Sequence, residues 1–118
     1  MQEIDTIYYN NYGVAFKWKR GAIKYIGKIQ LVFRDMGFLL SNEELGQFLD
    51  QIKKTKKEGS QCANCPNLEN CRELLLETPL NELSLVVSIK ELCDLVNLLE
   101  GTIFQLNLDN LIDGVCDY

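Results

Sequence analysis

The stretch from residue 36 to residue 52 reads MGFLLSNEELGQFLDQI, and a similar stretch from residue 83 to residue 99 reads LSLVVSIKELCDLVNLL. Each begins with apolar residues at alternate positions, which is the pattern of a strand with one buried face. Each continues with Ser-x-x-Glu, a capping box in which the serine and glutamate side chains bond each other's backbone N–H groups. The two stretches therefore predict the same strand-to-helix junction twice.

The residues around the two boxes also correspond. A hydrophobic staple is predicted at each helix start, from Leu40 with Leu45 and from Val87 with Leu92. The apolar positions of the first helix recur 47 residues later in the second. The matched pairs are Leu45 and Leu92, Phe48 and Leu95, Leu49 and Val96, and Ile52 and Leu99.

Two further strands are predicted at residues 14–18 and 29–33, where apolar side chains again alternate with others. Arg34 and Asp35 fit a tight turn into the strand that precedes the first helix. We therefore predict an α+β fold built from two β–β–α repeats. Their strands are expected to form one antiparallel sheet, with both helices on one face.

A chain of 118 residues, 47% of them hydrophobic, suits a single domain with its own core. Within the domain 1–118, residues 1–57 hold the first repeat with an N-terminal strand. Residues 58–71 form a cysteine-rich loop between the repeats, and residues 72–118 form the second repeat and a tail. The apolar residues of the tail are expected to pack on the core or on another chain.

The charges are divided unevenly along the chain, whose net charge is -5. Residues 1–57 carry a net +4 and residues 58–118 a net -9, so attraction between the two halves is the simplest interpretation. The acidic overall balance disfavours a nucleic-acid partner. The sequence has neither a membrane-spanning apolar stretch nor a secretory signal pattern, which predicts a cytoplasmic protein with no membrane association.

Three of the five cysteines, Cys62, Cys65 and Cys71, form a C-x2-C-x5-C cluster. With Cys116 as a fourth thiolate they would complete a tetrahedral zinc site, and an iron–sulfur cluster on the same ligands is the second interpretation. In the third interpretation the thiols stay free, or Cys62 and Cys71 form a disulfide. Zinc is favoured over iron–sulfur, and Cys93 is expected to pack as a small apolar residue.

The alternating strand, the Ser-x-x-Glu-Leu helix start and the stretch LLEGTIFQL at 98–106 resemble a family of short uncharacterised proteins from Bacteroidetes. The resemblance covers most of residues 23–112, and it does not indicate an activity for this protein. The cysteine spacing resembles segments of WhiB-type iron–sulfur regulators and of SPASM auxiliary-cluster domains. Both families draw further cysteines from upstream, whereas this chain has none before Cys62.

The sequence contains few of the residue combinations that catalysis requires. It contains no histidine, which excludes a Ser–His or Cys–His nucleophile pair, and no glycine-rich phosphate loop. Cys65, expected at a helix N-cap, is the one candidate nucleophile. We therefore predict that the protein is not an enzyme.

Two functions from different classes remain. The first is a binding or scaffolding module, forming a homodimer or binding another protein, because aromatic residues such as those here are enriched at interfaces. The second is a metal- or redox-sensing protein that uses the cysteine cluster. The aromatic residues concerned are Tyr8, Tyr9, Tyr12 and Trp18.

Elemental analysis of untagged protein purified without oxygen will distinguish the three states of the cysteines. Zinc near one equivalent, lowered by Cys62→Ser, is expected for the structural site. Iron with acid-labile sulfide would instead identify the cluster. If the protein contains neither metal and Cys62→Ser has unchanged stability, both metal sites are contradicted and the thiols are free.

Overall fold

A computed structural model describes the structure of residues 4–19, 27–59, 74–80 and 82–115. Within these ranges lie six strands and two helices. In chain order they are β1 (Ile4–Tyr9), β2 (Gly13–Trp18), β3 (Ile29–Phe33), β4 (Met36–Leu40), α1 (Asn42–Gly59), β5 (Leu74–Glu77), β6 (Ser84–Val87) and α2 (Ile89–Val115).

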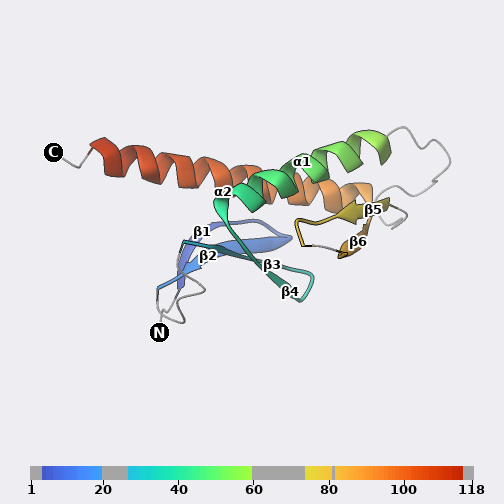
Figure 1. Cartoon of the computed structure of the whole chain (residues 1–118), viewed down its shortest axis with the longest axis horizontal. Helices are drawn as coiled ribbons and strands as arrows, with labels where there is room; N and C mark the ends of the chain where they lie inside the picture. The colour runs from blue at the N-terminus through green and yellow to red at the C-terminus, as the bar shows by residue number, and fades with distance from the viewer. Residues whose placement is uncertain (1–3, 20–26, 60–73, 81, 116–118) are drawn as a thin grey trace.

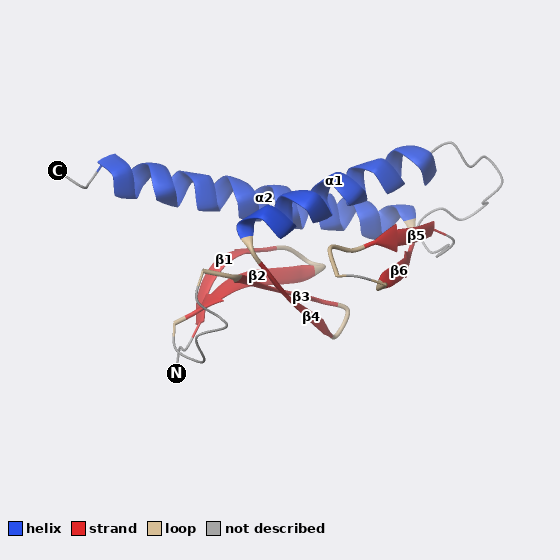
Figure 2. Ribbon diagram, viewed as in Figure 1, coloured by secondary structure: helices blue, strands red, loops and turns tan. Residues whose placement is uncertain are grey.

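The two helices form one layer and the strands form the other (Figure 2). This arrangement confirms the predicted α+β class. The strands in the described ranges divide into two antiparallel sheets, one of order β1-β2-β3-β4 and one that contains β5 and β6. The prediction of one continuous sheet was therefore wrong for this part of the chain.

The β3–β4 turn of the first sheet contacts the second sheet through a side chain. The two-residue turn between β3 and β4 holds Arg34 and Asp35 at positive φ, 51° and 63°, the combination of a type I′ turn that suits the strand twist. From this turn the Arg34 guanidinium donates a hydrogen bond of 3.0 Å to the Val86 carbonyl oxygen in β6. The β6 backbone at Val86 is therefore bonded by the Arg34 side chain and not by a strand of the first sheet.

Both strand-to-helix junctions have the predicted hydrogen bonds. Ser41 N–H donates to the Glu44 carboxylate at 2.9 Å, and Glu44 N–H donates to the Ser41 hydroxyl at 3.2 Å. Ser88 and Glu91 make the same pair of bonds, at 3.0 and 3.2 Å. The capping boxes that the sequence predicts are confirmed at the starts of α1 and α2.

The staple and helix-core predictions are also confirmed. Both staples are fully buried, and the four matched positions of α1 have the same burial as their counterparts in α2. These side chains pack with the inward residues of β2, β3 and β4 and with the hairpin of β5 and β6 in one core. The fully buried staple residues are Leu40, Leu45, Val87 and Leu92.

Strand β1 lies against α2 because a glycine allows close approach. A Cβ atom added at Gly101 would lie 2.3 Å from Cζ of the Tyr8 ring, so no side chain fits between the ring and the helix. Gly101 costs the helix about 1 kcal/mol relative to alanine, yet α2 continues past it to Val115. The glycine therefore serves the contact between sheet and helix.

Helix α2 is the longest element and gives the molecule its elongated shape, 56 × 29 × 27 Å. Its C-terminal turns extend beyond the start of α1 and beyond both sheets (Figure 1). Despite its 27 residues, neither α2 nor the other described helix is apolar enough to span a bilayer.

Truncation of the two equivalent leucines tests the predicted core. We expect Leu45→Ala and Leu92→Ala each to lower the free energy of unfolding by about 2–5 kcal/mol, because each leaves a cavity at a fully buried position. Urea unfolding provides the measurement. Leu75→Ala is the matched control, since this leucine is 63% exposed and its truncation should change stability by less than about 0.5 kcal/mol. A loss at either core position as small as the control's would contradict the proposed packing.

Candidate functional site

The four predicted metal ligands, Cys62, Cys65, Cys71 and Cys116, lie outside the described residues. Cys93 lies on α2 and is exposed, so the prediction that it packs as a small apolar residue was wrong. It follows Leu92 by one residue, and that step turns a helical side chain by about 100°, away from the core. Elsewhere in the described ranges, no three His, Cys, Asp or Glu side chains are grouped to hold a metal ion.

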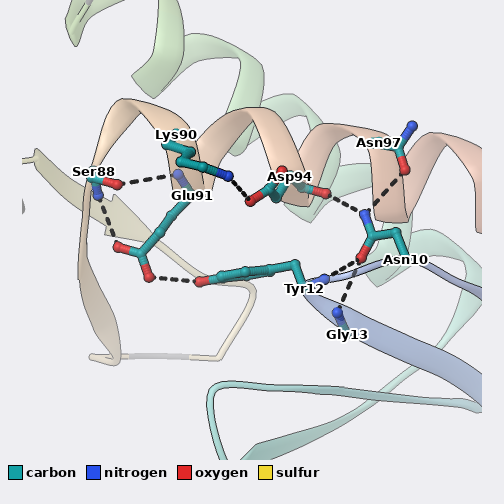
Figure 3. A network of polar contacts seen from close by, with 8 residues as sticks. All are labelled: Asn10, Tyr12, Gly13, Ser88, Lys90, Glu91, Asp94 and Asn97. Carbon is teal, nitrogen blue, oxygen red and sulfur yellow. Dashed lines mark hydrogen bonds and ion pairs between the residues drawn. The ribbon is translucent and has the colours of Figure 1, made fainter. Parts of the chain in front are cut away.

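Figure 3 shows the carboxylate of Glu91, the capping residue of α2, as an acceptor of hydrogen bonds from Ser88 and Tyr12. One oxygen accepts the Ser88 N–H bond at 3.0 Å. The other accepts a 2.8 Å hydrogen bond from the Tyr12 hydroxyl and lies 3.4 Å from Nε of Arg34. The carboxylate thereby joins α2 to the β1–β2 loop and to the β3–β4 turn.

Asn10 makes a second connection between the β1–β2 loop and α2 (Figure 3). Its side-chain oxygen accepts backbone N–H bonds from Tyr12 and Gly13, which shape the loop. Its side-chain nitrogen donates to the Asp94 carbonyl oxygen and to Asn97 Oδ1, each at 3.0 Å. The loop is therefore held to two successive turns of the helix.

Burial and the hydrogen bond to the Glu91 carboxylate raise the pKa of the Tyr12 hydroxyl far above its ordinary value, with the Glu91 charge adding to the effect and Arg34 opposing it. A phenol so strongly held in its neutral form is a poor base and a poor nucleophile at neutral pH. The Glu91 carboxylate is likewise occupied by donors from three elements. The arrangement is chemically suited to joining elements of the fold.

Sequence reasoning identified Glu91 as a capping residue but missed its contacts with Tyr12 and Arg34. A capping box specifies bonds over four residues, whereas Tyr12 and Glu91 are 79 residues apart. The four aromatic residues expected at an interface differ in their exposure and hydrogen bonding. Tyr8 and Tyr12 are half-buried and bond α2 residues, Trp18 is half-buried and donates to Gln30, and Tyr9 is 71% exposed.

The outer side of the β5–β6 hairpin carries exposed apolar side chains. Leu75 and Val86 are cross-strand partners and are 63% and 49% exposed. Leu80 and Leu83, in the loop that joins the strands, are also exposed. We call these four residues the hairpin face. Exposed large apolar side chains on one hairpin favour a surface that contacts another molecule.

Carboxylates border the hairpin face. Glu77 and Glu82 are both exposed and, with Leu80 and Leu83, line a hollow of about 270 Å³ at the end of the hairpin. Ser84 lies opposite Glu77 across the two strands. The surface therefore combines apolar contact area with negative charge at its rim.

Comparison of the chain with protein-family models, curated proteins and solved structures found no match.

The raised pKa of Tyr12 predicts a loss of stability at alkaline pH. The folded protein holds the phenol proton more tightly than the unfolded chain does. The contribution of Tyr12 to the stability of the fold is thus complete below the ordinary tyrosine pKa of about 10. It is lost as the pH rises through the higher pKa that Tyr12 has in the folded protein. We expect Tyr12→Phe to lower the free energy of unfolding by about 1.5 kcal/mol at neutral pH. The variant should also lose less stability than the natural protein as the pH rises above the ordinary tyrosine pKa. Urea unfolding at a series of pH values provides the measurement.

Tyr9→Phe is the matched control, because the Tyr9 ring is largely exposed. This variant should retain both the stability and the alkaline decline of the natural protein. The same alkaline decline in Tyr12→Phe and Tyr9→Phe would contradict the role assigned to the Tyr12–Glu91 hydrogen bond.

Proposed function

We propose that the protein is a small cytoplasmic binding or scaffolding module whose hairpin face binds a segment of another protein. The observation that carries the proposal is that Leu75 and Val86, cross-strand partners in a two-stranded sheet, are 63% and 49% exposed. Burial of such apolar side chains by a partner removes apolar surface from water and lowers the free energy of the complex. The hairpin packs into the core through Leu76, Leu85 and Val87, which keeps the cost of ordering this surface low.

The charges around the hairpin face favour a basic partner. Glu77 and Glu82 would attract lysine or arginine side chains that flank an apolar centre in the bound segment. The aliphatic stem of such a side chain could also contact Leu80 and Leu83 in the hollow. A partner rimmed by acids would be repelled by the same residues.

The described polar cluster supports a binding role over catalysis. Its donors and acceptors join the β1–β2 loop and the β3–β4 turn to α2, and the raised pKa of Tyr12 opposes proton transfer. Every buried side-chain nitrogen or oxygen in the described part of the chain has a hydrogen-bond partner. The fold therefore provides a rigid support for a surface.

A second candidate function rests on the cysteine spacing. The C-x2-C-x5-C cluster favours a zinc or iron–sulfur site on Cys62, Cys65, Cys71 and Cys116, used for sensing or for holding the segment between the two halves. This proposal is independent of the hairpin face. Elemental analysis of untagged protein purified without oxygen tests whether the cysteines bind zinc or iron.

We also propose that the two hairpin–helix units are copies of one ancestral unit. The support is the matched burial of the two helix starts and the identical capping bonds at Ser41 and Ser88. The two-residue β3–β4 turn and the longer β5–β6 loop mark where the copies differ.

Peptide binding tests the hairpin face. The probe is a short synthetic peptide with central valines flanked by lysines, titrated into the isotopically labelled protein and followed by NMR amide shifts. We expect saturable shifts at the hairpin face and at Glu77. Leu75→Lys should weaken binding by about tenfold or more, because it places a cation in the apolar contact.

The same peptide with glutamates in place of lysines is the charge control and should bind more weakly. Phe104→Ala is the protein control, since this exposed residue lies on α2 and outside the hairpin face. Equal binding of both peptides, or unchanged binding by Leu75→Lys, would contradict the proposal.

A further inference from the structure

The hydrogen bonds of the β5–β6 hairpin decide which backbone groups of β5 point away from β6. The Thr78 N–H donates a 3.3 Å bond to the Leu83 carbonyl oxygen, which makes these two residues a hydrogen-bonded pair. Bonded and non-bonded pairs alternate along an antiparallel ladder. Leu76 is therefore the next bonded residue of β5, whereas Leu75 and Glu77 direct their N–H and C=O groups away from β6.

A second contact supports this assignment. The Val86 carbonyl oxygen accepts the 3.0 Å bond from the Arg34 guanidinium, so it points away from β5. Val86 is the partner of Leu75, and the two are thus a non-bonded pair. The Arg34 bond also occupies the outer edge of β6 at Val86 and places a cation there, which disfavours pairing of a basic segment with this edge.

The outer edge of β5 is available for pairing. In the part of the chain that the structure describes, β5 pairs with β6 alone, and no other residue bonds the backbone of Leu75 or Glu77. The side chains of both residues are exposed. Their two N–H and two C=O groups form a template to which an extended segment can add as a third strand.

The side chains at this edge specify what kind of strand fits. Successive side chains of a strand point to opposite faces, so Leu75 and Glu77 share the outer face of the hairpin, while Leu76 is buried in the core. A strand added here fits best with an apolar side chain beside Leu75 and a basic one, two residues away, beside Glu77. A second copy fits less well, because another β5 would bring its own Glu77 carboxylate to this edge.

From the outward backbone groups of Leu75 and Glu77, their exposed side chains and the occupied edge of β6, we infer that the partner binds by strand addition. A segment in extended conformation pairs with the outer edge of β5 and places alternate apolar and basic side chains on the hairpin face. The inference rests on the proposed function, to which it adds the conformation, the backbone bonds and the sequence pattern of the bound segment. A helix laid across the hairpin face would contact the same side chains and leave the edge groups unpaired.

Amide hydrogen exchange, followed by NMR with the valine–lysine peptide as the probe, tests the inference. In the free protein the amide protons of Leu75 and Glu77 should exchange rapidly and that of Leu76 slowly, because only the Leu76 N–H faces β6. Saturation with the peptide should slow exchange at Leu75 and Glu77 by about tenfold or more.

Two outcomes of the exchange experiment would overturn strand addition. Amide shifts at the hairpin face without protection of Leu75 and Glu77 would do so and leave the proposed function standing. Protection that appears without the peptide, as the protein concentration is raised, would identify a second copy as the occupant.

Two peptide analogues, N-methylated at alternate residues and offset by one position, separate backbone pairing from side-chain contact. In an extended segment only every second N–H faces the edge of β5, and N-methylation removes the N–H. One analogue should therefore bind about tenfold or more weakly than the unmodified peptide, and the other about as well. Equal affinity of the two analogues would contradict strand addition, even where Leu75→Lys weakens binding as the proposed function requires.

Substitution of Glu77 gives a matched pair of protein variants. Glu77→Pro removes the edge N–H together with the carboxylate, and Glu77→Gln removes the charge alone. Proline fits an edge strand where the N–H faces outward, so Glu77→Pro should stay folded, which urea unfolding checks. The loss of one backbone bond should make Glu77→Pro bind the peptide about threefold to tenfold more weakly than Glu77→Gln. Equal binding by the two folded variants would overturn the inference.

Discussion

The carboxylate of Glu91 is the point on which the arrangement of the described elements depends. It closes the capping box of α2 with Ser88 and also receives the Tyr12 hydroxyl and the Arg34 guanidinium. Glu91 is 8% exposed, so each of these donors offsets part of the cost of removing a charge from water. Because the donors come from three different elements, satisfying one buried charge sets the position of the four-stranded sheet relative to α2.

The same interaction explains why two junctions with the same sequence pattern differ in their roles. Glu44 and Glu91 make equivalent bonds with Ser41 and Ser88. Glu91 in addition lies close to the β3–β4 turn, from which Arg34 reaches both its carboxylate and the Val86 carbonyl oxygen. Arg34 thus connects the first sheet to the second hairpin through a side chain.

Much of the local structure could be predicted from the sequence. The two capping boxes, the buried staples and the matched helix positions are all present, because each depends on residues within about two helical turns of one another. The single sheet was predicted wrongly, since strand alternation indicates which face is buried but not which strands pair. Strand β1 was also hard to recognise, because a register shift between Thr6 and Tyr8 interrupts its alternation.

The sequence alone specifies where α1 and α2 begin and which of their sides are apolar. These features follow from hydrogen bonds and side-chain spacing along a short piece of chain. Only the tertiary structure decided that Glu91 is shared with Tyr12 and Arg34, that Cys93 and Phe104 lie outside the core, and that Leu75 and Val86 form an exposed pair. Contacts between residues far apart in the chain depend on how the layers stack, which no local pattern specifies.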